Sequence, residues 1–172
     1  VFTSSGPESD YLALPGAARK ASQQGQGQEI LSMPVEHDAV AKTVAQLVEV
    51  MGFEHTALAV DQFGMLNVAA FAQACRPATT VASLMYANNE VGSILPIAQL
   101  AVSAKEHQVL LHTDAVQAAG QLPLDVNALG VDMMSISAHK FYGPKGVGAL
   151  FVREGVELTP SQSGASHEES RR

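Results

Sequence analysis

The sequence predicts an α/β domain with a mostly parallel sheet flanked by helices, and three observations support this prediction. Helical and strand-like patterns alternate along the chain. The strand-like segments are short and nearly continuous in apolar residues, as expected for strands covered on both faces. Hydrophobic residues make up 47% and charged residues 16% of the 172 residues, so the chain can form a substantial core.

Two long helices are predicted from apolar side chains at helical spacing. Residues 38–51 carry the clearest pattern, which ends at Gly52, a residue type that closes many helices. Residues 8–23 form the other, with Pro7 suited to its first turn and Pro15 expected to kink or shorten it. Shorter helices are predicted at 68–74 and 96–106.

The predicted strands are short apolar runs bounded by turn residues. They lie at 29–33, 56–60, 79–85, 109–112, 132–137 and 148–152, and residues 1–3 resemble the end of another strand. Loops are expected at 24–28, 61–64 and 161–166. Because the chain opens inside a strand-like segment and lacks an initiator Met, we expect it to be an internal piece of a longer protein.

Charge and composition argue against several classes of protein. The net charge is -7, from 10 Lys and Arg against 17 Asp and Glu, and no basic stripe is present, so nucleic acid is not an expected partner. We expect no membrane span, no secretory signal and no metal site. The single cysteine, Cys75, is expected to be structural and suits a reducing compartment, which favours the cytoplasm and leaves a mitochondrial location open.

Polar residues follow four of the predicted strands, at the point where each strand ends. Because ligands of open α/β sheets bind beyond the carboxyl ends of the strands, these residues are expected to meet at one rim. They are His37, Asn88, Asn89, Glu90, Asp114, Gln117, Ser137, His139 and Lys140. The convergence of four strands carries more weight than any single motif.

The residue types at this rim suit a pyridoxal-phosphate site. Lys140 ends a strand beside a Gly/Pro-rich turn, where we expect partial burial to favour a neutral, nucleophilic amine, although most loop lysines are simply exposed. Asp114 could pair with a pyridine nitrogen or cap the next turn, and both roles could hold at different atoms. His37 could stack on a cofactor ring or simply begin a helix. Gly6, in a Ser- and Gly-rich turn before a helix, is a candidate phosphate cradle.

Four segments together resemble the pyridoxal-phosphate-dependent cysteine desulfurases and selenocysteine lyases of the class-V aminotransferase family. They lie at 35–40, 87–92, 112–117 and 137–146 and occur in the family's order. The resemblance implies the large domain of a fold-type I pyridoxal-phosphate-dependent transferase. Residues 1–172 would then be a partial cofactor-binding domain, with the N-terminal segment and the C-terminal small domain missing.

The resemblance also implies a role for each residue. Lys140 would hold the cofactor as a Schiff base, His37 would stack on the ring, and Asp114 would pair with the ring nitrogen. The resemblance assigns the remaining residues to contacts with the ring oxygen region and the phosphate of the cofactor. Asn89 and Gln117 would contact the ring oxygen region, Ser137 and His139 the phosphate side, and the Gly6 backbone the phosphate itself.

Two departures qualify this resemblance. Pro7 replaces the usual phosphate-binding Thr of the family, which is expected to weaken phosphate binding unless Ser4 or Ser5 substitutes. In addition, the family's nucleophilic cysteine would lie beyond Arg172, and Cys75 does not match its position.

From the resemblance we expect a homodimeric cysteine desulfurase that removes sulfur from L-cysteine and passes it to a sulfur-acceptor protein, for example in iron–sulfur cluster assembly. A selenocysteine lyase acting on L-selenocysteine is one alternative. A degenerate, non-catalytic family member that serves as a binding partner is the other, and Pro7 motivates it.

Overall fold

The fold was obtained as a computed structural model, which describes residues 1–162. Its centre is a seven-stranded sheet with the order β1-β7-β6-β5-β4-β2-β3. The strands are β1 (Phe2–Thr3), β2 (Glu29–Ser32), β3 (Glu54–Ala57), β4 (Thr79–Ser83), β5 (Leu110–Asp114), β6 (Met133–Ser137) and β7 (Gly148–Val152). Strands β3, β2, β4, β5 and β6 pair in parallel, whereas β7 and β1 are antiparallel to their neighbours. The predicted α/β class with a mostly parallel sheet is confirmed.

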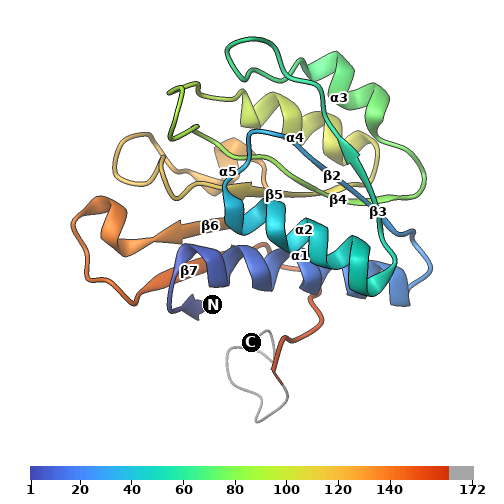
Figure 1. The fold of residues 1–172 in the computed structure, drawn as a ribbon, viewed down its shortest axis with the longest axis horizontal. Coiled ribbons are helices and arrows are strands. Elements are labelled where there is room, and N and C mark those ends of the chain that lie inside the picture. Colours follow the sequence, from blue (N-terminus) through green and yellow to red (C-terminus); the bar gives the residue numbers. More distant parts are fainter. Residues whose placement is uncertain (163–172) are drawn as a thin grey trace.

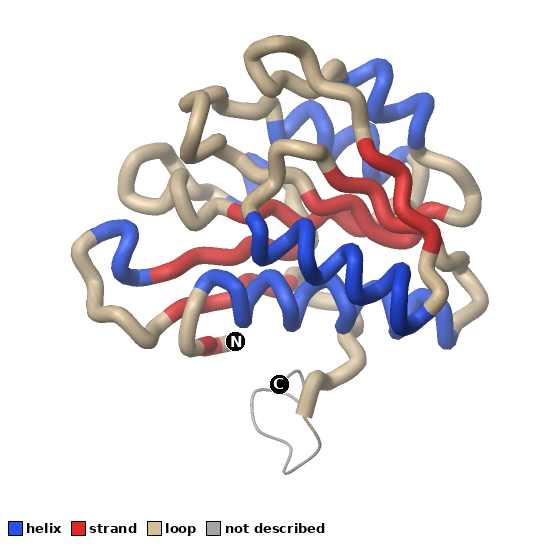
Figure 2. The backbone as a smooth tube through the Cα atoms, in the orientation of Figure 1, coloured by secondary structure: helices blue, strands red, loops and turns tan. Residues whose placement is uncertain are grey.

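Helices cover both faces of this sheet, as Figures 1 and 2 show. One layer contains α1 (Gly6–Gln23) and α2 (Asp38–Met51). The other contains α3 (Val68–Ala74), α4 (Ile97–Glu106) and the short α5 (Val126–Leu129). A 3-10 turn, η1 (Ala138–Phe141), follows β6 directly. This arrangement leaves the two ends of the parallel strands uncovered by helices.

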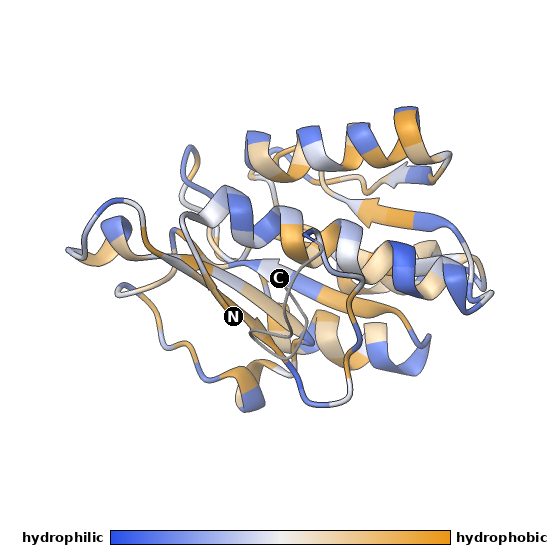
Figure 3. Ribbon diagram, turned by 90° about the horizontal axis from the view of Figure 1, so that it is seen from below, coloured by the Kyte–Doolittle hydropathy of each residue, from blue (hydrophilic) through white to orange (hydrophobic). Residues whose placement is uncertain are grey.

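Two apolar cores fill the spaces between the three layers. One includes Leu14, Val44 and Leu47 of α1 and α2 against Ile30 of the sheet. The other packs α3 and α4 against the opposite face and includes Phe71. Figure 3 shows the same distribution, with hydrophobic segments along the strands and mixed surfaces on the helices. Burial on both faces explains why the strands are continuous apolar runs.

Several predicted elements match the structure, and others do not. The bounds predicted for α2, α3 and β7 are confirmed. The prediction for β3 is wrong by two residues at its start, because the strand aligns with β2 from Glu54 onward. The helix at 8–23 begins earlier, at Gly6, with Ser5 as its cap, and it continues through Pro15. Helix α5 and the turn η1 were not expected, and the loop predicted at 161–166 lies mostly outside the described residues.

Candidate active site

A pocket of about 190 Å³ opens at the carboxyl ends of the parallel strands. The structure brings together here seven of the eight residues predicted to form the site, namely His37, Asn89, Asp114, Gln117, Ser137, His139 and Lys140. They come from the connections that follow β2, β4, β5 and β6. The rim predicted from strand ends is therefore present, because parallel strands deliver their following residues to one edge.

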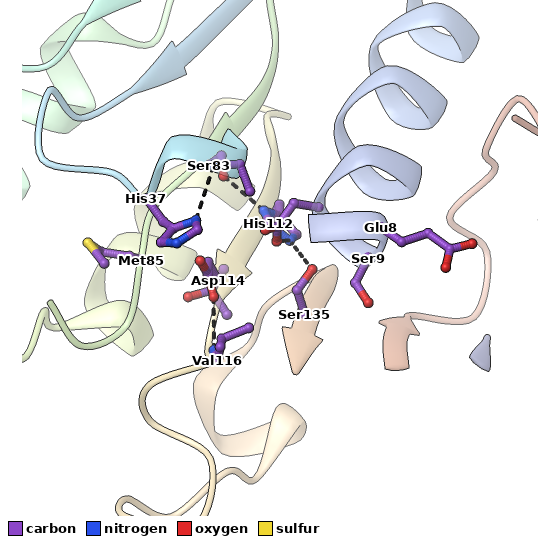
Figure 4. Close-up of polar contacts among 12 residues, drawn as sticks. Glu8, Ser9, His37, Ser83, Met85, His112, Asp114, Val116 and Ser135 are labelled. Atoms are coloured by element: carbon purple, nitrogen blue, oxygen red, sulfur yellow. Dashed lines mark hydrogen bonds and ion pairs between the residues drawn. The ribbon is translucent and has the colours of Figure 1, made fainter. Parts of the chain in front are cut away.

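Asp114 is the last residue of β5 and is buried at the pocket. Its Oδ1 accepts a hydrogen bond of 2.9 Å from the Val116 backbone N–H, shown in Figure 4. Burial raises the pKa of this carboxyl, while that N–H and the charges of His37 and Lys140 oppose the rise. One oxygen thus holds the following turn, and the other is left for a positively charged ligand atom.

His37 is the N-terminal cap of α2, and its Nδ1 accepts the Ala39 backbone N–H at 3.1 Å. This bond orients the imidazole, which Figure 4 shows close to Met85 and Asp114. The preceding residue, Glu36, holds the same turn in place, because its Oε1 accepts the Met85 backbone N–H at 3.0 Å. The ring is therefore placed by both its own helix and the end of β4.

Lys140 lines the pocket from η1, but the partial burial predicted for it is wrong, because its side chain is exposed. The 3-10 turn bends the chain away from the sheet as soon as β6 ends. Tyr142 closes this turn in the left-handed conformation, with φ 68°. The position of Lys140 at the pocket is therefore what singles it out.

Gly6 lies in the first turn of α1, against two residues that follow other strands. A Cβ at this position would approach Val116 Cγ2 to 2.7 Å and Ser137 Cβ to 3.4 Å, so only glycine allows this close contact. Ser137 Oγ in turn lies 2.9 Å from His139 Nδ1. Gly6 itself is buried and does not line the pocket, whereas Ser137 and His139 do. The close packing of Gly6 brings the N-terminus of α1, a place that favours anions, next to Ser137.

Pro7 lines the same pocket at the start of α1 and offers no backbone N–H. The two serines that could replace the expected Thr already have partners. Ser4 Oγ donates to Glu8 Oε2 at 2.6 Å, and Ser5 Oγ accepts the Glu8 N–H at 3.2 Å. The Ser5 hydroxyl hydrogen remains available to a ligand, because that bond uses only its oxygen.

Sequence reasoning missed two acids whose pKa is raised by burial: Asp10, which lines this pocket, and Glu36, which precedes His37 and does not line it. Asp10 lines the pocket from α1 with 1% of its surface exposed. A signal for it existed, because it shares the helix face of Leu14 and Ala17, both buried. Burial raises the pKa of Glu36 well above its usual range, the Met85 N–H opposes this, and the charges of Asp114 and Asp10 add to it.

A larger groove lies at the opposite ends of the strands. A groove of about 510 Å³ lies near the amino ends of β5 and β6 and includes Asp132 and Arg153. Both side chains are already committed to the backbone. Arg153 Nη2 donates to Val126 O at 2.6 Å, and Asp132 Oδ2 accepts the Leu111 N–H at 2.8 Å. The groove therefore offers a ligand fewer unengaged polar groups than the smaller pocket does.

Residues 1–162 contain neither a cluster of metal ligands nor a membrane-spanning helix. Within that part of the chain, no three or more His, Cys, Asp or Glu side chains gather in a way that could hold a metal ion. Helices with the length and apolar character needed to cross a bilayer are likewise absent from the same residues.

Comparison with known proteins identifies the family. The family model described as "Aminotransferase class-V" matches residues 1–171. The chain belongs to the class-V aminotransferase family. Among class-V relatives, the cysteine desulfurase IscS of Dictyoglomus turgidum is 46% identical over 172 residues, and that of Methanosarcina thermophila is 46% identical over 171 residues. These matches cover 100% and 99% of this chain, respectively.

Solved structures of class-V-like proteins show the same architecture. A protein described as NifS-like superposes with a TM-score of 0.93 at 36% identity, and DndA from Streptomyces lividans with 0.91 at 37% identity. Each alignment covers 100% of this chain but only 47% and 49% of the respective structure. The chain also spans only 43% and 42% of the two IscS relatives, which is less than half of their length.

Proposed function

We propose that the protein is a pyridoxal-phosphate-dependent cysteine desulfurase that takes sulfur from L-cysteine. The observation that carries the proposal is a single pocket in which Lys140, Asp114 and His37 meet. A nucleophilic amine, an acid for a ring nitrogen and an aromatic ring are what this cofactor needs from a protein. Relatives at 46% identity that are named cysteine desulfurase support the choice of substrate.

The residues present fit the cofactor in size and in charge. A cavity of about 150 Å³ admits a benzene ring, so the 190 Å³ of this pocket can admit a substituted six-membered ring. Asp114 presents an acid with one oxygen not engaged by Val116, and Ser137 and His139 beside the N-terminus of α1 suit the phosphate. Both ends of the cofactor would thus meet groups of complementary charge.

Each residue then has a definite task. Pyridoxal phosphate, when bound, supplies a reactive aldehyde and a ring that accepts electrons. Lys140 Nζ would bond to the cofactor and, once displaced by the substrate amine, would move the proton at the substrate Cα. Asp114 would keep the ring nitrogen protonated, and His37 would hold the ring plane from one side.

The thiol that receives the sulfur is not Cys75. This residue follows α3 and precedes β4, so it lies toward the amino ends of the strands and away from Lys140. Burial, followed by the charge of Glu29, raises the pKa of the Cys75 thiol to about 11, which disfavours the reactive thiolate. The acceptor cysteine would come from another part of the complete protein, which we expect to be a cytoplasmic homodimer that donates sulfur to an acceptor protein.

The test is the visible absorption of the complete protein, expressed from its whole reading frame, with added pyridoxal phosphate. We expect an absorption band of a lysine-bound cofactor in the parent and in Lys145→Ala, and no such band in Lys140→Ala. Lys145 is the matched control because it is an exposed lysine of the same turn that does not line the pocket.

A second step measures alanine and protein-bound sulfur after addition of L-cysteine, and alanine and released selenium after separate addition of L-selenocysteine. Production of both from L-cysteine in the parent supports the proposal, and a clear preference for L-selenocysteine would replace it with a selenocysteine lyase. A folded protein without any cofactor band would instead favour a non-catalytic binding partner.

A further inference from the structure

A second carboxyl group lies at the same pocket as Asp114, and none of the tasks above uses it. Asp10 extends from the second turn of α1, is 1% exposed, and lines the pocket. Its Oδ1 is buried and has no hydrogen-bond partner. A buried polar atom without a partner is unfavourable, so its retention at a ligand pocket calls for an explanation.

The nearest charged or titratable neighbour of that oxygen is a buried histidine. His112 Nε2 lies 3.6 Å from Asp10 Oδ1, which is too long for a hydrogen bond. The imidazole is held on both sides, with Nδ1 2.8 Å from Ser83 Oγ and Nε2 2.9 Å from Ser135 Oγ, as Figure 4 shows. Burial lowers the pKa of His112 to about 3, so this ring is neutral at pH 7 and makes no ion pair with Asp10.

The two carboxyl groups differ in what favours their ionised form. Burial and then the charge of Asp114 raise the pKa of Asp10 to about 8, while the Ser135 side chain opposes the rise. Burial also raises the pKa of Asp114, but the Val116 N–H and the charges of His37 and Lys140 oppose it. Because two acids in one buried site do not both ionise readily, the proton belongs on Asp10 and the negative charge on Asp114.

One further acid has a raised pKa. Glu36, from the turn after β2, has a buried Oε2 without a hydrogen-bond partner, and burial raises its pKa well above the usual range. Glu36 does not line this pocket. The groups that act on Asp10 or lie against it are Asp114, Ser135 and the neutral His112.

We propose that Asp10 and His112 form a positioning pair beneath Asp114, in which a neutral Asp10 leaves Asp114 as the single negative charge facing a ligand's ring nitrogen. The hydrogen bonds of His112 with Ser83 and Ser135 hold the imidazole in place beside Asp10. The proposal rests on the proposed function in one respect, because it takes the ligand to be a cofactor with a basic ring nitrogen.

The first test concerns Asp10 itself and needs no cofactor. Infrared spectra of the complete protein without cofactor are recorded against pH for the parent and for Asp10→Asn. In the parent we expect a protonated carboxyl band at neutral pH that is lost near pH 8, and we expect Asp10→Asn to lack this band. A carboxyl band that both proteins share would belong to another acid, such as Glu36, whose pKa is also raised. If both proteins give the same carboxyl band across this range, Asp10 is ionised at neutral pH and the proposal is wrong.

The second test measures what Asp10 does to a bound ligand. With pyridoxal phosphate bound, the midpoint of the visible absorption change with pH is expected to stay unchanged in Asp10→Asn, because one neutral side chain replaces another. If Asp10 were ionised beside the ligand, loss of its charge would move the midpoint by about one pH unit. Asp132→Asn is the matched control, a half-buried acid of the same sheet that lies away from the pocket. Asp10→Leu, which also cannot titrate, replaces Asp10→Asn if the latter does not fold.

These outcomes separate the two proposals. Loss of the carboxyl band together with a midpoint that moves by about one pH unit would show that Asp10 is neutral in the empty pocket but ionised beside the ligand, which overturns the positioning role. A protein that binds no pyridoxal phosphate, yet loses the carboxyl band in Asp10→Asn, would overturn the proposed function while supporting the charge assignment within the pair.

Discussion

Acids at the two ends of the sheet differ in their hydrogen bonding and in the direction in which their pKa values are shifted. At the amino end, Glu29 begins β2 with a fully buried side chain. Arg76 contacts both of its carboxylate oxygens, with Nε 3.1 Å from Oε2. Thr56 and Thr79 donate to the same carboxylate at 2.7 and 2.5 Å. Burial raises the pKa of Glu29, but these hydrogen bonds outweigh it and leave the pKa below its usual value.

At the carboxyl end, Asp10 and Glu36 are buried without such partners, and their pKa values are raised. Burial is therefore not the difference between the two ends; hydrogen bonding is. The amino end uses an acid to hold β2, β3 and β4 together, because Glu29, Thr56 and Thr79 lie on these three strands. The carboxyl end keeps acids that are only partly satisfied, which is a common feature of ligand pockets.

The largest expected effect is a loss of catalytic activity at the carboxyl end of the sheet without a loss of folding stability. Asp114→Asn removes the charge that would face the ring nitrogen, and we expect cofactor-dependent kcat to fall about 100-fold or more, as for loss of one pre-organised electrostatic contact. Since burial raises the pKa of Asp114, the folded state at neutral pH is expected to be as stable or more stable. Steady-state kinetics and urea unfolding of the complete protein measure the two effects, and a large loss of stability would contradict the comparison.

The converse change is at the amino end. Arg76→Met leaves the Glu29 carboxylate without its cation, and we expect a loss of about 2–3 kcal/mol in the free energy of unfolding, below the full value for a buried pair because the Arg76 side chain is 56% exposed to water. Urea unfolding measures this loss. The double variant Glu29→Gln with Arg76→Met is expected to recover part of it, and kcat per folded molecule should not change.

The pH dependence of stability should have opposite signs at the two ends. The pKa of Glu29 is lowered, so its contribution is present above the unfolded pKa of 4.5 and is lost as pH falls through the folded value. The pKa of Asp10 is raised to about 8, so the unfolded state binds fewer protons between the unfolded pKa of 3.8 and pH 8, and stability falls as pH rises through this window.

Asp10→Asn should remove the second of these slopes. We expect the variant to lose less stability than the parent between pH 4 and pH 8, by on the order of 2 kcal/mol, allowing for relaxation around the buried group. Urea unfolding across this pH range measures the difference in the protein without cofactor. Equal slopes for parent and variant would mean that Asp10 gains a partner that keeps it ionised.

The smallest effect concerns the start of α1. Pro7→Thr restores an N–H and a hydroxyl at the pocket, and one hydrogen bond to a charged group is worth about 1.5–3 kcal/mol. We expect the Kd for pyridoxal phosphate to fall by roughly tenfold, at the low end of that range, because Ser5 already offers a hydroxyl nearby. Equilibrium titration followed by absorption measures the Kd, and an unchanged value would show that the phosphate does not contact this turn.

Much of the site was predictable because its residues follow strands. His37, Asn89, Asp114 and Lys140 each come after a short apolar run, and a parallel sheet brings such positions to one edge. The helices with strong apolar periodicity were predictable for a similar reason. Pro15 was misleading, because removal of one helical hydrogen bond is tolerated where the rest of α1 is packed into the core.

The sequence by itself determined the α/β class, the order of the elements and the rim on which the polar residues lie, because these depend on local periodicity and chain direction. Only the tertiary structure decided which acids find hydrogen-bond and charge partners. Glu29 meets Arg76, 47 residues further along the chain, while Asp10 lies against His112 without a hydrogen bond. The charge of a buried carboxyl depends on partners that the folded chain brings near, and no local pattern records those distances.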